Sequence, residues 1–195
     1  MGPGGSDKPL KDALRSQALG RRDALCEASR QEAALAIAGH LAVLAKDLPQ
    51  GPVAAYWPIR SEADPRAGAD DLRQRGHEIA LPAVTPHGLV FRRWEVNDPL
   101  ARAGFGLWEP LPESPQIVPR TLLVPLAAFD RRGHRIGYGK GHYDRALAAL
   151  GRVLTIGIAF SVQEINLIPD EPHDHPLDFV VTEREILNTA QQRDL

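Results

Sequence analysis

The fold class can be inferred most directly from residues 122–160, LLVPLAAFDRRGHRIGYGKGHYDRALAALGRVLTIGIAF. A dense apolar strand is expected over 122–129, followed by a glycine-rich loop over 130–142. A helix over 144–150 and a second apolar strand over 153–160 complete the unit. Fully apolar strands that alternate with helices predict a largely parallel sheet covered on both faces, with sites at the carboxyl ends of its strands.

The remainder of the chain extends this alternation. Two amphipathic helices are expected first, one running from the Asp7 cap to Leu25 and one opened by the capping pair Ser29 and Glu32. Pro125 predicts that its strand lies at an edge, carries a bulge or ends early. The other expected elements are strands over 53–57, 77–81, 88–94 and 178–182, a helix over 65–76, a loop over 98–113, and a final helix capped by Thr182 and Glu185.

Composition narrows the class of protein. The 195 residues are 43% apolar and 25% charged, which is typical of a globular chain, and we expect one domain over 7–195 after a flexible tail over 1–6. A net charge of -2 argues against general nucleic-acid affinity, and the longest apolar stretch, 33–45, is shorter than the roughly 20 residues of a membrane span. With one cysteine and no recognisable leader, we expect a cytoplasmic monomer that acts on small molecules.

The loop before the 144–150 helix has the features of an anion site. Gly137, Gly139 and Gly141 alternate, so the backbone can approach a ligand closely, and amides ahead of a helix N-terminus favour a phosphate. Nearby cationic side chains, Arg131, Arg132, Arg135, Lys140 and Arg145, would neutralise its charge. The alternative is an ordinary strand-to-helix turn with a solvated charged rim.

Two carboxylates are candidate metal ligands. Asp144 is either a helix cap or a Mg²⁺ ligand, because Mg²⁺ at nucleotide sites is held by one or two carboxylates and phosphate oxygens. Asp174 would supply the second carboxylate. It lies between His173 and His175, a spacing that also permits a zinc site, although no third ligand follows at a suitable distance.

Other candidates have an ordinary structural alternative. Lys11 and Arg15 share a helix face, which is most often solvated, whereas Glu62 follows a strand, where α/β folds carry sites. Four aromatic residues either pack in the core and at its rim or line a site for a flat ligand: Trp57, Phe105, Trp108 and Tyr143.

The motif VPLAAFD over 124–130, with Gly133, Arg135 and GYGKGHYDR over 137–145, resembles the signature of the 5-formyltetrahydrofolate cyclo-ligase family. Further matches follow in order along the chain: Lys11, Arg15, Glu62, FGLWEP over 105–110, Asp174 and Asp178. The resemblance implies an α/β fold of three layers, with a mostly parallel sheet between helices, similar to the NagB, ribose-phosphate isomerase and CoA-transferase group. It also implies ATP- and Mg²⁺-dependent conversion of 5-formyltetrahydrofolate to 5,10-methenyltetrahydrofolate.

The resemblance also implies roles for individual residues. ATP contacts match Lys11, Arg15, Arg135, Ile136, Gly137, Tyr138, Gly139, Lys140, Gly141, His142 and Tyr143. Of these, Lys11, Arg15, Arg135 and Lys140 would neutralise charge during phosphoryl transfer. Folate contacts match Trp57, Glu62, Phe105, Tyr138, Gly139, Lys140, Gly141 and His142. The magnesium-side carboxylates match Asp144 and Asp174.

Two other functions remain as alternatives. The family usually has a second aromatic residue where this chain has His142, which motivates a folate-binding or buffering protein with little turnover. A sugar-phosphate isomerase or effector-binding domain of related fold is the other alternative, because fold does not determine function.

Overall fold

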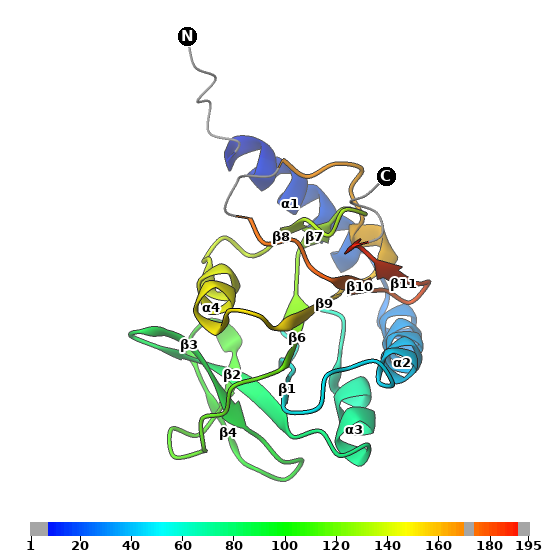
Figure 1. Cartoon of the computed structure of the whole chain (residues 1–195). Helices are drawn as coiled ribbons and strands as arrows, with labels where there is room; N and C mark the ends of the chain where they lie inside the picture. The colour runs from blue at the N-terminus through cyan, green and yellow to red at the C-terminus, as the bar shows by residue number, and fades with distance from the viewer. Residues whose placement is uncertain (1–7, 170–173, 191–195) are drawn as a thin grey trace.

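The computed structural model describes residues 8–169 and 174–190. Among them, a seven-stranded sheet has the order β11-β10-β9-β6-β1-β2-β3 (Figure 1). Its strands are β1 (Val53–Ala54), β2 (Ile79–Thr85), β3 (Gly88–Arg93), β6 (Thr121–Pro125), β9 (Leu154–Ile158), β10 (Phe179–Val181) and β11 (Ile186–Asn188). The inner pairs are parallel, whereas β2 with β3 and β10 with β11 are antiparallel. The sheet is therefore mostly parallel, as expected.

Helices cover both faces of the sheet. On one face, α2 (Glu27–Leu44) and α3 (Arg66–Gln74) pack against a cluster that includes Ile37, Leu41 and Leu72. On the other, α4 (His142–Leu150) contributes Ala146 and Leu147 to a second cluster. The expected strand over 122–129 is apolar throughout because β6 is buried between these two layers.

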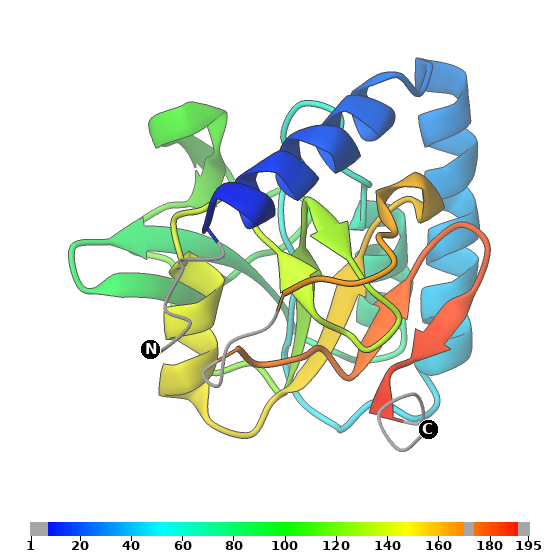
Figure 2. The same cartoon turned by 90° about the horizontal axis from the view of Figure 1, so that it is seen from above.

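A third group of contacts lies at the carboxyl ends of the parallel strands, outside the two helical layers. Here α1 (Lys8–Asp23) lies across the small antiparallel pair β7 (Ala128–Phe129) and β8 (Arg135–Ile136) (Figure 2). Ala18 of α1 joins a third cluster with residues of both short strands and of the 165–168 segment. The first helix therefore lies over the edge at which a site was expected.

The expected strand over 122–129 is interrupted at Pro125. Pro125 is the last residue of β6, which is a central strand, and the chain then leaves the sheet to form β7. Of the three interpretations of this proline, the early end of the strand is the correct one. A proline is compatible with this position because the strand stops before a further amide donor is needed.

Two predicted helix caps are wrong. Helix α2 begins at Glu27, because Cys26 rather than Ser29 is its N-cap and the Cys26 Sγ accepts a hydrogen bond from the Ser29 amide. At the other end, Thr182 and Glu185 close a turn between β10 and β11 instead of starting a helix. The Thr182 Oγ1 accepts hydrogen bonds from the amides of Arg184 and Glu185, both at 3.2 Å.

The segment expected as a loop over 98–113 contains a small sheet. Strands β4 (Leu100–Arg102) and β5 (Trp108–Pro110) pair antiparallel around a short 3₁₀ turn, η1 (Gly104–Gly106). The Glu109 carboxylate accepts a hydrogen bond from the Val84 amide and so connects this hairpin to β2. The strand expected over 77–81 begins later and extends further, to Thr85.

Two features concern the chain as a whole. The expected tail over 1–6 and the predicted cap Asp7 lie outside the described residues. No described helix combines the length and the apolar character needed to cross a membrane.

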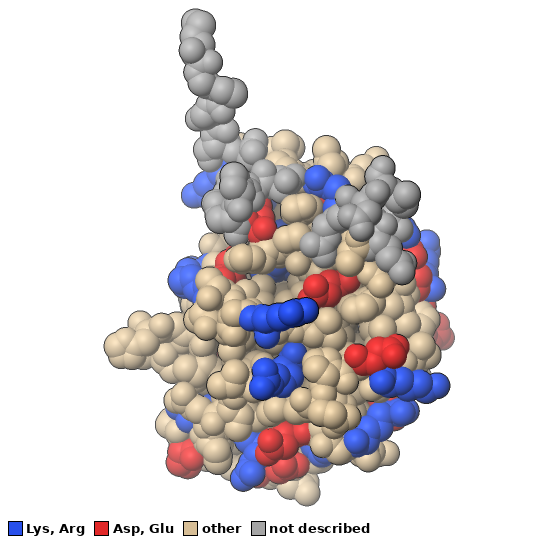
Figure 3. Space-filling model, viewed as in Figure 1, with Lys and Arg blue, Asp and Glu red and all other residues tan. Residues whose placement is uncertain are grey.

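The described part of the face in Figure 3 intersperses acidic and basic side chains. A short 3₁₀ helix, η2 (Ser161–Gln163), follows β9 and contacts α1.

Candidate active site

The glycine loop connects β8 to α4 directly. Gly139 and Gly141 have φ values of +84° and +62°, in the left-handed region that favours glycine, and Gly141 is the N-cap of α4. The helix therefore begins at His142, two residues before the expected start, and Asp144 lies in its first turn. Because Gly141 is the N-cap of α4, the alternative role of Asp144 as the helix cap is wrong.

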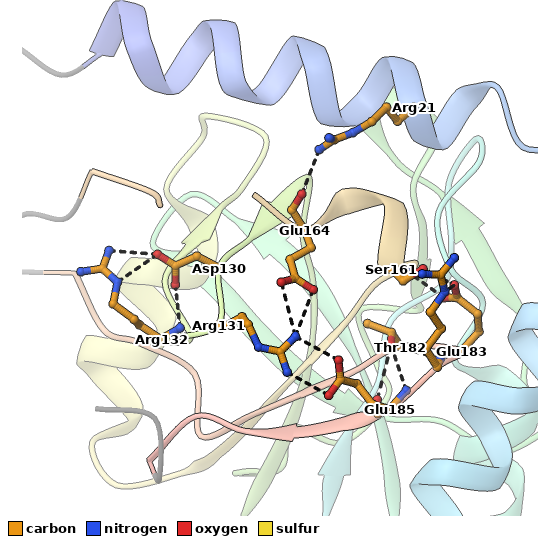
Figure 4. A network of polar contacts seen from close by, with 10 residues as sticks. Arg21, Asp130, Arg131, Arg132, Ser161, Glu164, Thr182, Glu183 and Glu185 are labelled. Atoms are coloured by element: carbon orange, nitrogen blue, oxygen red, sulfur yellow. Dashed lines mark hydrogen bonds and ion pairs between the residues drawn. The ribbon is translucent and has the colours of Figure 1, made fainter. Parts of the chain in front are cut away.

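A buried carboxylate holds the turn before this loop. Asp130 has no exposed surface and accepts hydrogen bonds from the amides of Arg132, His134 and Ile168 and from the Arg132 guanidinium. Around it, Arg131 bridges Glu164 and Glu185, which connects the turn to η2 and to the β10–β11 hairpin (Figure 4). The position of β8, and with it the glycine loop, is therefore fixed by the hydrogen bonds and ion pairs around Asp130 and Arg131.

Helix α1 places one cation on the glycine loop and another on Asp174. The Arg15 Nε donates a 2.7 Å hydrogen bond to the Gly137 carbonyl oxygen, and the Lys11 Nζ lies 3.1 Å from the Asp174 Oδ2. Arg15 also pairs with Asp12. Lys11 and Arg15 thus lie on the face of α1 that contacts the candidate site, and not on a freely solvated face.

Arg135 lies between the two predicted metal-side carboxylates. Its guanidinium pairs with Asp144 and donates a 2.7 Å hydrogen bond to the His175 carbonyl oxygen. Burial lowers the pKa of Arg135, and the negative charges of Asp144 and Asp174 oppose that shift. Asp144 and Asp174 are therefore both close to one cation. Among the described residues no group of three or more His, Cys, Asp or Glu side chains is arranged to hold a metal ion, and His173 of the zinc alternative lies outside them.

Glu62 is the centre of the second half of the site. Burial raises the pKa of its carboxyl group, while hydrogen bonds from Tyr138 and the Ile59 amide and the charge of Arg22 oppose the shift. In turn, the pKa values of Tyr56, Tyr138 and Tyr143 are raised chiefly by burial and then by the charge of Glu62. The charge of Glu62 thus acts on all three phenols, and Tyr138 also donates a hydrogen bond to it.

The remaining candidates are placed as follows. The half-buried Trp57 ring packs edge-on against Trp94 at 5.7 Å and lies 4.7 Å from the Arg66 guanidinium, on the side of α3. Lys140 is exposed, and its carbonyl oxygen accepts a hydrogen bond from Arg145, which also contacts the His142 ring. Phe105 lies in η1, and its side chain is outside what the structure describes.

Sequence reasoning missed Arg22. This residue lies in the last turn of α1, is 2% exposed, and its Nη1 donates a 2.6 Å hydrogen bond to the Tyr138 hydroxyl. A sequence signal does exist, because Arg22 follows Leu14 and Ala18 at intervals of four and so falls on the buried face of the helix.

Comparison with known proteins decides the family. The model of the 5-formyltetrahydrofolate cyclo-ligase family matches residues 7–183. The chain belongs to this family. Among cyclo-ligase relatives, the Mycolicibacterium smegmatis protein is 34% identical over 185 residues, covering 88% of this chain and 93% of its own. The Escherichia coli K12 cyclo-ligase is 28% identical over 175 residues, covering 85% and 96%.

Solved structures agree with the cyclo-ligase assignment. The Aquifex aeolicus 5,10-methenyltetrahydrofolate synthetase has a TM-score of 0.75 and 31% identity, covering 92% of this chain and 93% of its own. The Mycoplasma pneumoniae synthetase has a TM-score of 0.71 and 27% identity, covering 89% and 98%. The predicted family and the α/β fold class are therefore confirmed, and the chain is a ligase of folate one-carbon metabolism.

Proposed function

We propose that this cyclo-ligase closes 5-formyltetrahydrofolate to 5,10-methenyltetrahydrofolate in a reaction driven by ATP, releasing ADP and phosphate. The observation that carries the proposal is a connected group of cations and carboxylates beside one glycine loop. Arg15 donates to Gly137 of this loop, Lys11 pairs with Asp174 and Arg135 pairs with Asp144. The same loop reaches Glu62 through Tyr138. One end of the site suits a polyphosphate and the other suits a polar heterocycle. The two substrates would therefore meet along residues 137–143.

The cationic end would bind ATP. Lys11 and Arg15 approach from α1, Arg135 from β8, and the loop amides precede the N-terminus of α4. Positive charge and backbone amides stabilise phosphate oxygens, and they do so most strongly where charge develops during transfer. The exposed Lys140 would contact the phosphates from the rim of the same loop.

The residues present fit a magnesium ion that arrives with ATP. Asp144 and Asp174 lie around Arg135, and a Mg²⁺ ion at a nucleotide site needs only one or two carboxylates besides phosphate oxygens and water. When bound, Mg²⁺ would neutralise charge on the transferring phosphoryl group. The present partners of these carboxylates, Arg135 and Lys11, would then be available to the phosphates.

The other end would bind the folate. The Glu62 carboxyl group, which accepts a hydrogen bond from Tyr138, would offer an acceptor in the segment that follows β1, and a pterin ring carries N–H donors. Trp57 and Phe105 would line this end, as the resemblance implies, although the Trp57 ring now packs on Trp94 and Arg66.

The reaction needs little covalent chemistry from the protein. The formyl oxygen attacks the γ-phosphate of ATP, and ADP leaves. The second folate nitrogen then adds to the activated carbon, the carbon–oxygen bond breaks as phosphate departs, and the nitrogen releases its proton. Lys11, Arg15 and Arg135 would orient the phosphates and stabilise the charge that develops on them.

The test follows the near-ultraviolet absorbance of the conjugated product in a mixture of purified protein, 5-formyltetrahydrofolate, ATP and Mg²⁺. We expect a product band that grows over many turnovers and that requires both ATP and the metal. Separate omissions of ATP and of Mg²⁺ provide the controls. A flat trace from folded protein that still binds 5-formyltetrahydrofolate by calorimetry would contradict the proposal and support the folate-binding alternative suggested by His142.

A further inference from the structure

Arg22 is a buried charge next to the candidate active site. It is 2% exposed, and a guanidinium in such a place destabilises the fold unless its donors are paired. The Nη1 donates to the Tyr138 hydroxyl at 2.6 Å, and the Nε donates to the Ser61 Oγ at 3.0 Å and to the Asp23 Oδ1 at 3.2 Å. Its position is therefore determined by specific partners.

These partners belong to three separate segments. Asp23 ends α1, Ser61 immediately precedes Glu62, and Tyr138 belongs to the glycine loop. The Ser61 hydroxyl in turn donates to Asp23. A rigid, planar group with several donors can hold such segments in one arrangement, which a flexible lysine cannot do.

The turn before Glu62 needs such support. Arg60 has a φ of +53° and is the one described residue other than glycine with a positive φ. This conformation is disfavoured for side chains with a Cβ and persists only where the surroundings impose it. Within the turn, the Ile59 amide donates to the Glu62 Oε2 at 2.9 Å, so that the strained turn and the direction of the carboxylate are coupled.

We propose that Arg22 is a positioning residue for the folate half of the site, holding the Tyr138 hydroxyl and the Glu62 turn in the geometry that receives the heterocycle. Its burial keeps it from the substrate, so it acts through Tyr138 and through Ser61. This inference rests on the proposed function. It adds a residue that makes no contact with ATP or folate but determines folate affinity.

The test is a double-mutant cycle on the active enzyme. Arg22→Met, Tyr138→Phe and the double variant are compared with the wild type in three quantities: the Michaelis constant for the folate substrate, the Michaelis constant for ATP, and the calorimetric affinity for the folate substrate. We expect each single variant to raise the Michaelis constant for the folate about tenfold, as for one charge-assisted hydrogen bond, and Arg22→Met to change the constant for ATP less than about twofold. The double variant should be no worse than Arg22→Met alone.

Two further variants separate positioning from folding. Arg21→Met removes the neighbouring cation, which is exposed and donates to the Glu164 carbonyl oxygen, away from Tyr138 and Ser61, and it should leave both Michaelis constants unchanged. If Arg22→Met does not fold, Ser61→Ala removes one acceptor and should weaken folate binding on its own. Arg22→Lys should recover only part of the affinity, because it cannot serve both acceptors.

The outcomes are distinct. Folate affinity that is unchanged in folded Arg22→Met or in Ser61→Ala, or losses that multiply in the double variant, would overturn the inference. If the wild type forms no product, the proposed function fails instead, and the calorimetric affinities for the folate substrate then decide the role of Arg22 by themselves.

Discussion

Glu62 has an unusual environment for a carboxylate in a turn. Burial raises its pKa, and burial also raises the pKa values of Tyr56, Tyr138 and Tyr143, on which the charge of Glu62 acts. A buried carboxyl group with a raised pKa opposes stability when it ionises in the free protein.

The raised pKa of Glu62 predicts a pH-dependent effect of Glu62→Gln. The native state keeps the proton above the ordinary pKa of 4.5, so the unfolded state binds fewer protons and the wild type loses stability as pH rises through this range. The amide does not ionise, so Glu62→Gln should gain thermal stability relative to the wild type between pH 4.5 and neutrality. Melting temperatures of both proteins at several pH values measure this difference.

The control replaces an exposed carboxylate. Glu113→Gln should follow the wild type across the same pH range, because Glu113 lies on the surface. A difference between Glu62→Gln and the wild type that is constant with pH would show that folding does not raise the pKa of Glu62, and one that shrinks as pH rises would show that the carboxylate is stabilised as an anion.

At the residue level, the sequence indicated which cationic residues belong to the candidate site better than it indicated which residues they pair with. The resemblance implied that Lys11, Arg15 and Arg135 share one site; in the structure Arg15 donates to Gly137, Lys11 pairs with Asp174 and Arg135 pairs with Asp144. The pairing of Lys11 with Asp174 spans 163 residues, and no local pattern contains such a distance. Arg22 was overlooked because an arginine in a helix is ordinarily exposed, and only its helical phase indicates otherwise.

At the element level, most strands of the seven-stranded sheet were predictable, whereas the strands of the two small sheets were not. The strands β6 and β9 lie within segments that are apolar throughout, so both are evident in the sequence. By contrast β7 and β8 have two residues each, which is too short for any periodicity, and they exist because the Asp130 turn pairs them. The same residue types that cap helices close the turn after Thr182, so the final hairpin was mistaken for a helix.

The glycine loop allows a test of local conformation. Gly141 adopts φ +62° at the N-cap of α4, whereas Gly137 has no positive φ and would have open space around an added Cβ. Gly141→Ala should therefore cost about 1–2 kcal/mol of unfolding free energy through left-handed backbone strain. Gly137→Ala is the matched control and should be close to neutral. Urea denaturation measures both, and equal losses would place the effect in the loop as a whole instead of in the conformation of Gly141.

At the scale of the whole molecule, the layers differ in how firmly they are held. Helix α2 buries four residues in the main cluster, whereas α1 buries two, one of them the charged Arg22. The remaining contacts of α1 with the site are polar, through Lys11 and Arg15. The helix that covers the candidate active site is thus the one with the smaller apolar contact.

This asymmetry predicts a difference in amide hydrogen exchange. In the free protein, α1 should exchange faster than α2, because local opening follows from few buried apolar contacts. When ATP and Mg²⁺ are added, Lys11 and Arg15 would gain phosphate contacts, so exchange in α1 should slow while α2 changes little. Mass spectrometry of peptides from both helices measures the effect. The α2 peptides, which include the exposed residues Leu35 and Val43, serve as the internal reference. If α1 were as protected as α2 in the free protein and unaffected by the nucleotide, it would be a fixed part of the core, and the phosphate role of Lys11 and Arg15 would lose its support.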